Sequence, residues 1–180
     1  MLQAVFVPYA IHHLRLAPAG VGITLAAYGF GMVIGALAAP RMMARLSLGT
    51  VVAIGPITGF AAALVMVLTI AMPSAILAGL AFLLLGAGPI VWVVSTTTLR
   101  QIITPAPLLG RISAFSSLAN GARPIGAALG GAVGSMFGAE VALILAALGF
   151  LAQMLLILLS PVVRQSAQPS GQETSPIGLR

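Results

Sequence analysis

The chain carries very little charge and lacks two residue types altogether. It contains no lysine and no cysteine, and only two of its 180 residues are acidic, against eight arginines. Without cysteine it can form no disulfide bond, no thiolate nucleophile and no cysteine-ligated metal site. Charged residues make up 6% of the sequence, whereas soluble domains carry about 25%. This composition cannot build a water-facing surface, which excludes a soluble globular protein.

The scarcity of carboxylates also leaves no active site in view. The only acids are Glu140 and Glu173, and no paired carboxylates, Ser-His-Asp set or metal-ligand cluster can be assembled from the sequence. His12 and His13 are adjacent, so on a helix they point about 100° apart and form a poor metal pair. We therefore predict no enzyme, no metal and no cofactor, and an interfacial place at a loop edge for the two histidines.

Hydrophobic residues make up 60% of the chain, and the mean hydropathy is +1.16. A bilayer core about 30 Å thick is crossed by roughly 20 helical residues. Unbroken apolar runs of that length favour helices over barrel strands. The full-length runs are 20–40, 51–72, 75–98, 112–136 and 141–162. The sequence thus predicts an all-α, polytopic membrane bundle with five full transmembrane helices.

The arginines occupy alternate loops. Five of them lie in one set of loops, namely Arg41, Arg45, Arg100, Arg111 and Arg164, whereas the other set holds only Arg15. The positive-inside rule places the basic loops in the cytoplasm. We therefore predict that 41–50, 99–111 and the C-terminal segment are cytoplasmic, and that 12–18, 71–74 and 137–140 face outward across a cell membrane. The net charge of +6 then reflects membrane topology. The sequence contains no basic stripe interleaved with aromatic residues, so we predict no binding of nucleic acid.

The two ends of the chain differ from the apolar runs. Residues 1–14 are apolar but too short to cross, Pro8 interrupts them, and no basic residue precedes them as a secretory signal would require. We interpret them as part of a transmembrane helix, which would make the chain start partway through a six-helix unit, with 15–163 as the main bundle. Residues 164–180, rich in Gln, Ser and Pro, are predicted to be a disordered cytoplasmic tail.

The run 112–136 has one polar face. At 100° per residue, a single arc of about 120° holds Ser113, Ser116, Ser117, Asn120 and Arg123. Arg123 would lie roughly 18 Å into the helix, near the bilayer centre, where a charge costs at least about 2.5 kcal/mol. Two interpretations stay open: Arg123 caps carbonyls freed by Pro124, or it lines a cavity and binds an acceptor-rich substrate group or a carboxylate from other helices.

Small residues recur at helical spacing on two of the runs. Gly126, Gly130 and Gly134 repeat every four residues, and Gly31 and Gly35 continue a stripe that contains Thr24 and Tyr28. Such stripes allow close helix contact, so we predict that these glycines pack against other helices. Tyr28 and Trp92 are candidates either for a substrate cavity or for packed contacts. The runs 51–72 and 141–162 hold few polar residues and are expected to face lipid.

Two loops resemble those of the major facilitator superfamily. Residues 35–49, GALAAPRMMARLSLG, resemble the basic loop between the second and third helices of a half of such a carrier. Residues 99–114, with Pro124-Ile125-Gly126 downstream, resemble the region that joins the tenth and eleventh helices of drug- and siderophore-efflux members. The first loop lacks the acid of the fuller motif.

This resemblance covers residues 1 to about 163 and implies the C-terminal half of a twelve-helix carrier. The helices at 20–40, 75–98 and 112–136 would then line a cavity for a small-molecule substrate, the other two would pack outside, and Arg41, Arg45, Arg100 and Arg111 would lie in loops that take part in gating. The partner would be an N-terminal six-helix half, supplied by the same gene, by a separate chain or by self-pairing, against which this half rocks. A non-transporting membrane subunit or truncated gene product is the alternative, and a permease of the ABC type is a third.

Overall fold

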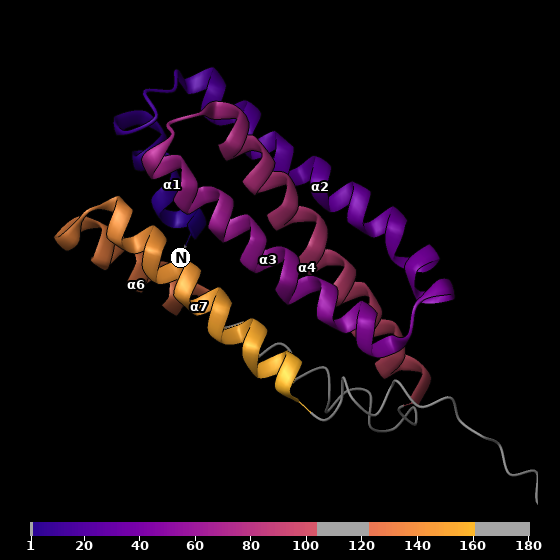
Figure 1. Cartoon of the computed structure of the whole chain (residues 1–180). Coiled ribbons are helices and arrows are strands. Elements are labelled where there is room, and N and C mark those ends of the chain that lie inside the picture. Colours follow the sequence, from indigo (N-terminus) through magenta and orange to yellow (C-terminus); the bar gives the residue numbers. More distant parts are fainter. Residues whose placement is uncertain (1, 104–122, 161–180) are drawn as a thin grey trace, which may run out of the picture.

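A computed structural model describes residues 2–103 and 123–160, and these residues form a bundle of helices (Figure 1). The helices are α1 (Leu2–His12), α2 (Pro18–Arg45), α3 (Leu48–Ala71), α4 (Ala75–Ile103), α6 (Arg123–Phe137) and α7 (Ala139–Leu159). No strand occurs in the described ranges, which confirms the all-α prediction. Four of the helices, α2, α3, α4 and α7, are long and apolar enough to cross a membrane. The predicted span 112–136 lies partly outside the described residues, and α6 covers its second half.

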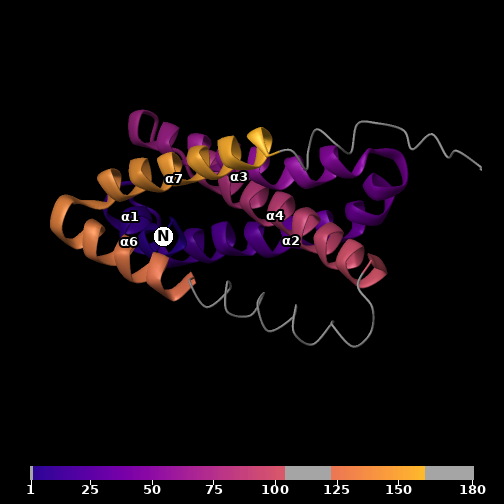
Figure 2. The ribbon, with the colours of Figure 1, turned by 90° about the horizontal axis from the view of Figure 1, so that it is seen from below.

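The contacts made by the first three helices correspond to those made by the last three. α4 lies between α2 and α3, while α1 lies against α6 and α7, and α3 meets α7 across the middle (Figures 1 and 2). Exchanging α1 with α4, α2 with α6 and α3 with α7 reproduces these contacts. This is the pattern expected of two three-helix repeats within a six-helix half.

The contact between α2 and α4 is made backbone to backbone. A Cβ atom at Gly31 would meet the backbone of Leu83, and one at Gly35 would meet the backbone of Ala87. From the other side, a Cβ atom at Gly86 would meet the carbonyl of Tyr28. In lipid, where apolar side chains gain little by leaving their solvent, such close approach is a main source of helix association.

Glycines also bring α3 close to its two neighbours. Gly88 of α4 leaves room for the Thr58 side chain of α3, and Gly59 of α3 lies 3.1 Å from the Phe150 ring of α7, measured from an ideal Cβ. Thr58 donates its hydroxyl proton to its own helix, at the Ile54 carbonyl 2.7 Å away. The threonine is thus satisfied internally and needs no polar partner on the neighbouring helix.

An apolar core lies where α1, α3, α4 and α7 converge. Its fully buried side chains include Phe6, Met66, Phe82 and Leu143. The rings of Phe6 and Phe82 lie in direct contact, with their centroids 4.3 Å apart and their planes tilted by 51°. Through Phe6, the short helix α1 is anchored in the centre of the bundle.

The helix boundaries differ from those read off the apolar runs. α1 continues through Pro8, which the sequence reading took as an interruption, and α2 continues through Pro40 to Arg45, into the segment predicted as a loop. An apolar run measures the stretch that suits lipid, whereas a helix continues through good helix formers such as arginine. Ser47 then caps α3, since its hydroxyl oxygen accepts a hydrogen bond from the Thr50 amide at 3.4 Å.

α2 and α3 differ in how far other helices cover them. α2, predicted to line a cavity, is the more open of the two, since 22% of its most apolar 18-residue stretch is buried. In α3, predicted to face lipid, the corresponding share is 44%. α3 is covered by α4 on one side and by α7 on another. α2 has α4 as its main neighbour, so most of its surface has no covering within the described residues.

Candidate functional site

Most of the predicted polar face on 112–136 cannot be placed. Ser116, Ser117, Asn120 and Arg111 lie outside the described residues. Two other predicted residues have a described backbone but no described side chain. Arg123 is the first residue of α6, and Arg100 lies in α4 near its C-terminal end.

The two aromatic candidates lie between helices. Tyr28 of α2 packs against the core, with its ring edge-on to Phe82 at a centroid distance of 6.4 Å. Trp92 of α4 is half-buried, and its Cβ atom lies against Gly55 of α3. In the described bundle, both side chains therefore help to fix α4 between its neighbours.

The glycine stripe of α6 has different surroundings along its length. A Cβ atom at Gly134 would lie 3.5 Å from Val5 of α1 and 3.9 Å from Ala142 of α7. Gly130 is buried, whereas the space around Gly126 is open. Gly134 thus lies in ordinary contact with α1 and α7, as predicted for a residue that packs against other helices.

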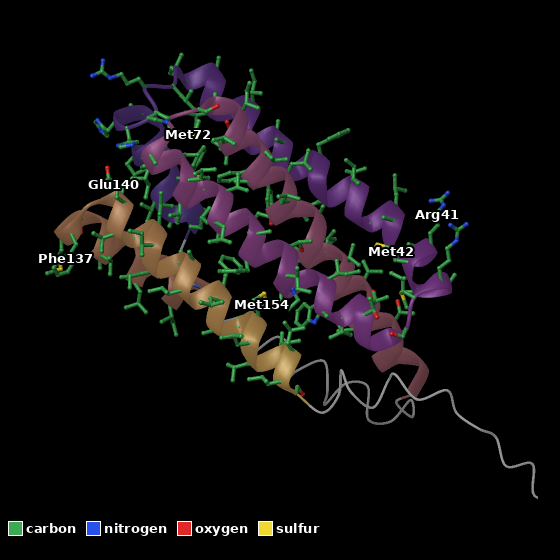
Figure 3. The ribbon with its side chains drawn as sticks, in the orientation of Figure 1. Arg41, Met42, Met72, Phe137, Glu140 and Met154 are labelled. Atoms are coloured by element: carbon green, nitrogen blue, oxygen red, sulfur yellow. The ribbon has the colours of Figure 1, made fainter. Side chains whose placement is uncertain are left out.

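The arginines of α2 lie at one end of the bundle, away from Glu140 (Figure 3). Arg41 and Arg45 are both exposed, in the last turns of the helix. The Arg41 guanidinium donates a hydrogen bond to the Leu37 carbonyl at 3.2 Å. Cations at a helix C-terminus are favoured by the helix dipole.

A chain of polar side chains occupies the opposite end. The hydroxyl groups of Tyr9 and Thr69 lie 2.8 Å apart and are buried, and Thr69 also lies 2.6 Å from the Met66 carbonyl, to which its hydroxyl can donate. A tyrosine on α1 is thereby tied to α3. Buried hydroxyl groups of this kind are costly unless they are paired.

The same row of polar side chains continues from α1 to α7. The Tyr9 ring stacks on the His13 ring at 4.9 Å and 14°, and His13 Nδ1 lies 3.1 Å from Glu140 Oε1. Glu140 lies in the first turn of α7, where the helix dipole favours a negative charge. Gly138 makes the turn that brings α7 back beside α6, with φ at 92°, a conformation suited to glycine.

A pocket of about 410 Å³ opens beside this polar chain. Its lining residues come from α1, α6 and α7 and the turns next to them: Pro8, Tyr9, His12, His13, Gly134, Phe137, Gly138, Ala139, Glu140 and Val141. Its volume falls in the range of small-molecule sites. In the described part of the chain, no three potential metal ligands come together.

Sequence reasoning did not find this site. It assigned the histidines to a loop edge and treated Glu140 as a lone acid, although its own topology placed 12–18 and 137–140 on the same side of the membrane. That shared side is the signal that could have linked His13 to Glu140. The four-residue spacing of Tyr9 and His13 is a second signal, because side chains at that spacing are neighbours on a helix. The bond from Tyr9 to Thr69 depends on tertiary packing and leaves no trace in the sequence pattern.

Removing the Tyr9 hydroxyl tests how much the hydrogen bond between Tyr9 and Thr69 contributes to stability. We expect Tyr9→Phe to lower the free energy of unfolding by about 0.6–1 kcal/mol, the usual net value of one hydrogen bond between membrane helices. The loss is limited because Thr69 keeps its bond to the Met66 carbonyl. Titration of the full chain in detergent micelles with SDS measures it.

Tyr28→Phe is the matched control, since no hydrogen bond of the Tyr28 hydroxyl is found within residues 2–103 and 123–160. Equal stability of the two variants would show that the hydroxyl pair contributes nothing.

Comparison with known families agrees with this architecture. The chain matches the family model described as transmembrane secretion effector over residues 6–176, which includes α2, α3, α4, α6 and α7 completely. No curated protein and no solved structure matches it. The matched family consists of membrane transporters rather than enzymes. Together with its apolar membrane-spanning helices, this match shows that the chain is a multi-pass membrane protein that belongs to the transmembrane secretion effector family of the major facilitator superfamily.

Proposed function

We propose that this chain forms one six-helix half of a carrier that exports small amphipathic solutes by alternating access against a second half. The described helices support the count, because the contacts of α4 with α2 and α3 and of α1 with α6 and α7 follow two three-helix repeats, and one half of a major facilitator contains two such repeats. The word secretion in the family description supports export. The arginine pattern supports a cell-membrane carrier whose C-terminus is cytoplasmic.

The open surface of α2 is the observation that carries the proposal. Gly22, Ala26 and Gly29 are exposed there, and nothing lies within 4 Å of an ideal Cβ on either glycine. On its other side, α2 uses Gly31 and Gly35 to approach α4 closely. Small residues allow helices to approach closely in membranes. The small residues on the open side of α2 would therefore allow close contact with helices of the second half.

A small, mostly apolar substrate is favoured by the helices that border the open side. Large apolar side chains are exposed on α2 and α6, including Phe30, Leu37, Ile125 and Leu129. A solute that binds among such residues must itself present apolar surface. Arg123 would add one cation for an acceptor-rich group of the solute.

The size of the native product tests whether two halves act together. An antibody against residues 165–180 should detect, in source-cell membranes, a product about twice the 18.1 kDa mass of this chain, as two six-helix halves require. A product at 18.1 kDa would mean that the chain recruits a separate partner half, pairs with itself or does not transport. The cysteine-free background then allows Ala26→Cys to be tested for disulfide-linked dimers, with Leu156→Cys on the exposed face of α7 as control.

Absence of a larger product, of a disulfide-linked dimer in Ala26→Cys and of solute flux would overturn the half-carrier proposal. Those three results would favour the non-transporting membrane subunit.

Arg123→Ala tests the proposed substrate cavity. If Arg123 binds a substrate group, flux of an amphipathic dye through the intact carrier should fall at least about tenfold, the equivalent of about 1.4 kcal/mol and well within the value of a charge in a low-dielectric site. Transport into inverted vesicles, at matched membrane levels, is the measurement. Arg15→Ala, which removes an exposed arginine in the loop between α1 and α2, is the control. Unchanged flux in Arg123→Ala would leave Arg123 with a structural role alone.

A further inference from the structure

We propose that His13 and Glu140 form a proton-binding site that acts as a latch on one end of the bundle. This end, the histidine end, contains the turns at 13–17, 72–74 and 138. Figure 3 shows Glu140, Phe137 and Met72 together at it, and Arg41 at the other end. The proposal goes beyond solute export, because it concerns the opening of this end whichever solute the carrier moves.

The latch joins segments that are far apart in the sequence. His13 follows α1 directly and is held back on that helix by a hydrogen bond from its amide to the Tyr9 carbonyl at 2.8 Å. Its Nδ1 atom reaches Glu140 Oε1 of α7 at 3.1 Å, with side chains 29% and 51% exposed respectively. Because Tyr9 stacks on His13 and bonds to Thr69, separating His13 from Glu140 removes the polar contact between the end of α1 and α7, while the apolar packing of α1 deeper in the bundle remains.

The strength of this contact depends on whether the imidazole carries a proton. Histidine is the side chain whose charge ordinarily changes between about pH 5 and 8. When His13 is protonated, its contact with Glu140 is a charge-assisted hydrogen bond, roughly twice as strong as a neutral one. When His13 is neutral, one ordinary hydrogen bond remains. The latch is therefore strong at acidic pH and weakens as the pH rises.

The other nitrogen of the ring adds to the tendency to open. His13 Nε2 is buried and has no hydrogen-bond partner within the described residues. A buried polar atom without a partner gains hydration when its surroundings open. Exposure of Nε2 to water favours the open state whether or not the ring is protonated, so the pH dependence of the latch comes from the contact with Glu140.

Few other charges act on this site. His12 lines the same pocket and is exposed, and Arg15 follows in the loop, also exposed. The neighbours contributed by α3 and α6, such as Thr69 and Phe137, carry no ionisable group. Glu140 is the one acid among residues 2–103 and 123–160. Protonation of His13 thus has a single anion with which to pair at this end.

The absence of cysteine makes the latch measurable by thiol labelling. Ala10 of α1 is 0% exposed, so a single Ala10→Cys change in the full chain reports opening of the histidine end. Met72→Cys, at a position 62% exposed, gives the reference rate and corrects for the pH dependence of the reagent. The chain is placed in nanodiscs and treated with a polar maleimide at pH 5.5 and at pH 8. We expect the labelling rate of Ala10→Cys, relative to that of Met72→Cys, to be roughly threefold higher at pH 8 than at pH 5.5. A change of that size is within what a partly exposed ion pair contributes to stability.

Variants of the pair separate the latch from other causes. His13→Gln and Glu140→Gln should each abolish the pH dependence of the relative rate, and His12→Gln should retain it. A second reporter, Ala142→Cys on α7, is at a position 1% exposed and should behave in the same way; it replaces Ala10→Cys if that variant does not elute as a single species. A relative rate that does not change with pH, or that still changes in His13→Gln and Glu140→Gln, would overturn the proposal.

Discussion

Replacing Gly86 with alanine is expected to separate α2 from α4. The new methyl group would meet the Tyr28 carbonyl and the Met32 amide, which are backbone atoms of a neighbouring helix and cannot rotate away. Overpacking of this kind costs about 1–3 kcal/mol where side chains can adjust, and more where they cannot. We expect a loss of about 3 kcal/mol in the free energy of unfolding. SDS titration, followed by fluorescence of the single tryptophan, measures the loss.

The matched control lies on the same helix. Nothing lies within 4 Å of an ideal Cβ at Gly79 of α4, so Gly79→Ala changes the residue type without a clash. Because alanine favours a helix by up to about 1 kcal/mol over glycine, this variant should be as stable as the parent or slightly more so. Equal behaviour of the two variants would mean that α2 and α4 do not touch through their backbones.

Phe82→Ala is the second change with a large expected effect. Phe82 is 0% exposed and contacts the rings of Phe6 and Tyr28, so its removal leaves a cavity where α1, α2 and α4 meet. Phenylalanine to alanine changes in soluble cores cost about 3–5 kcal/mol. In lipid the transfer part of that cost is smaller, because the separated helices remain in an apolar solvent, whereas the loss of packing contacts is unchanged. We expect a loss of at least about 2 kcal/mol, measured by the same titration.

Phe30→Ala provides the comparison, since Phe30 of α2 is 62% exposed. A side chain without close neighbours leaves no cavity when it is removed. Its effect should remain within about 0.5 kcal/mol. If Phe30→Ala were as harmful as Phe82→Ala, the cost would come from residue type rather than from packing.

The apolar runs predicted most of the fold because lipid restricts what a spanning segment can be. Runs 20–40, 51–72, 75–98 and 141–162 correspond to α2, α3, α4 and α7, since a backbone in hydrocarbon must satisfy itself within a helix. The helix ends were less predictable. Arg41 and Arg45 read as loop residues, yet they extend α2, because charge stops an apolar run without stopping a helix.

The candidate site was less predictable than the fold. His13 and Glu140 are separated by almost the whole bundle along the chain, and their approach depends on how α1 packs beside α7. Sequence reasoning instead favoured Arg123 and its polar neighbours, because an arginine deep in an apolar run is visible without any tertiary structure. That choice stays a prediction, to be decided by the flux of Arg123→Ala.

The position of α1 has a consequence for the order in which the protein assembles. Helices are made from the N-terminus onward, and the backbone of α1 lies chiefly against α6 and α7, with less contact to α2. By contrast, α2, α3 and α4 find their main neighbours as soon as α4 has been inserted. α1 can therefore complete its packing only after α6 and α7 have been inserted. Ribosomes stalled before α6 should hold a nascent chain in which α2 to α4 are already associated, whereas the side of α1 that later meets α6 and α7 is still uncovered.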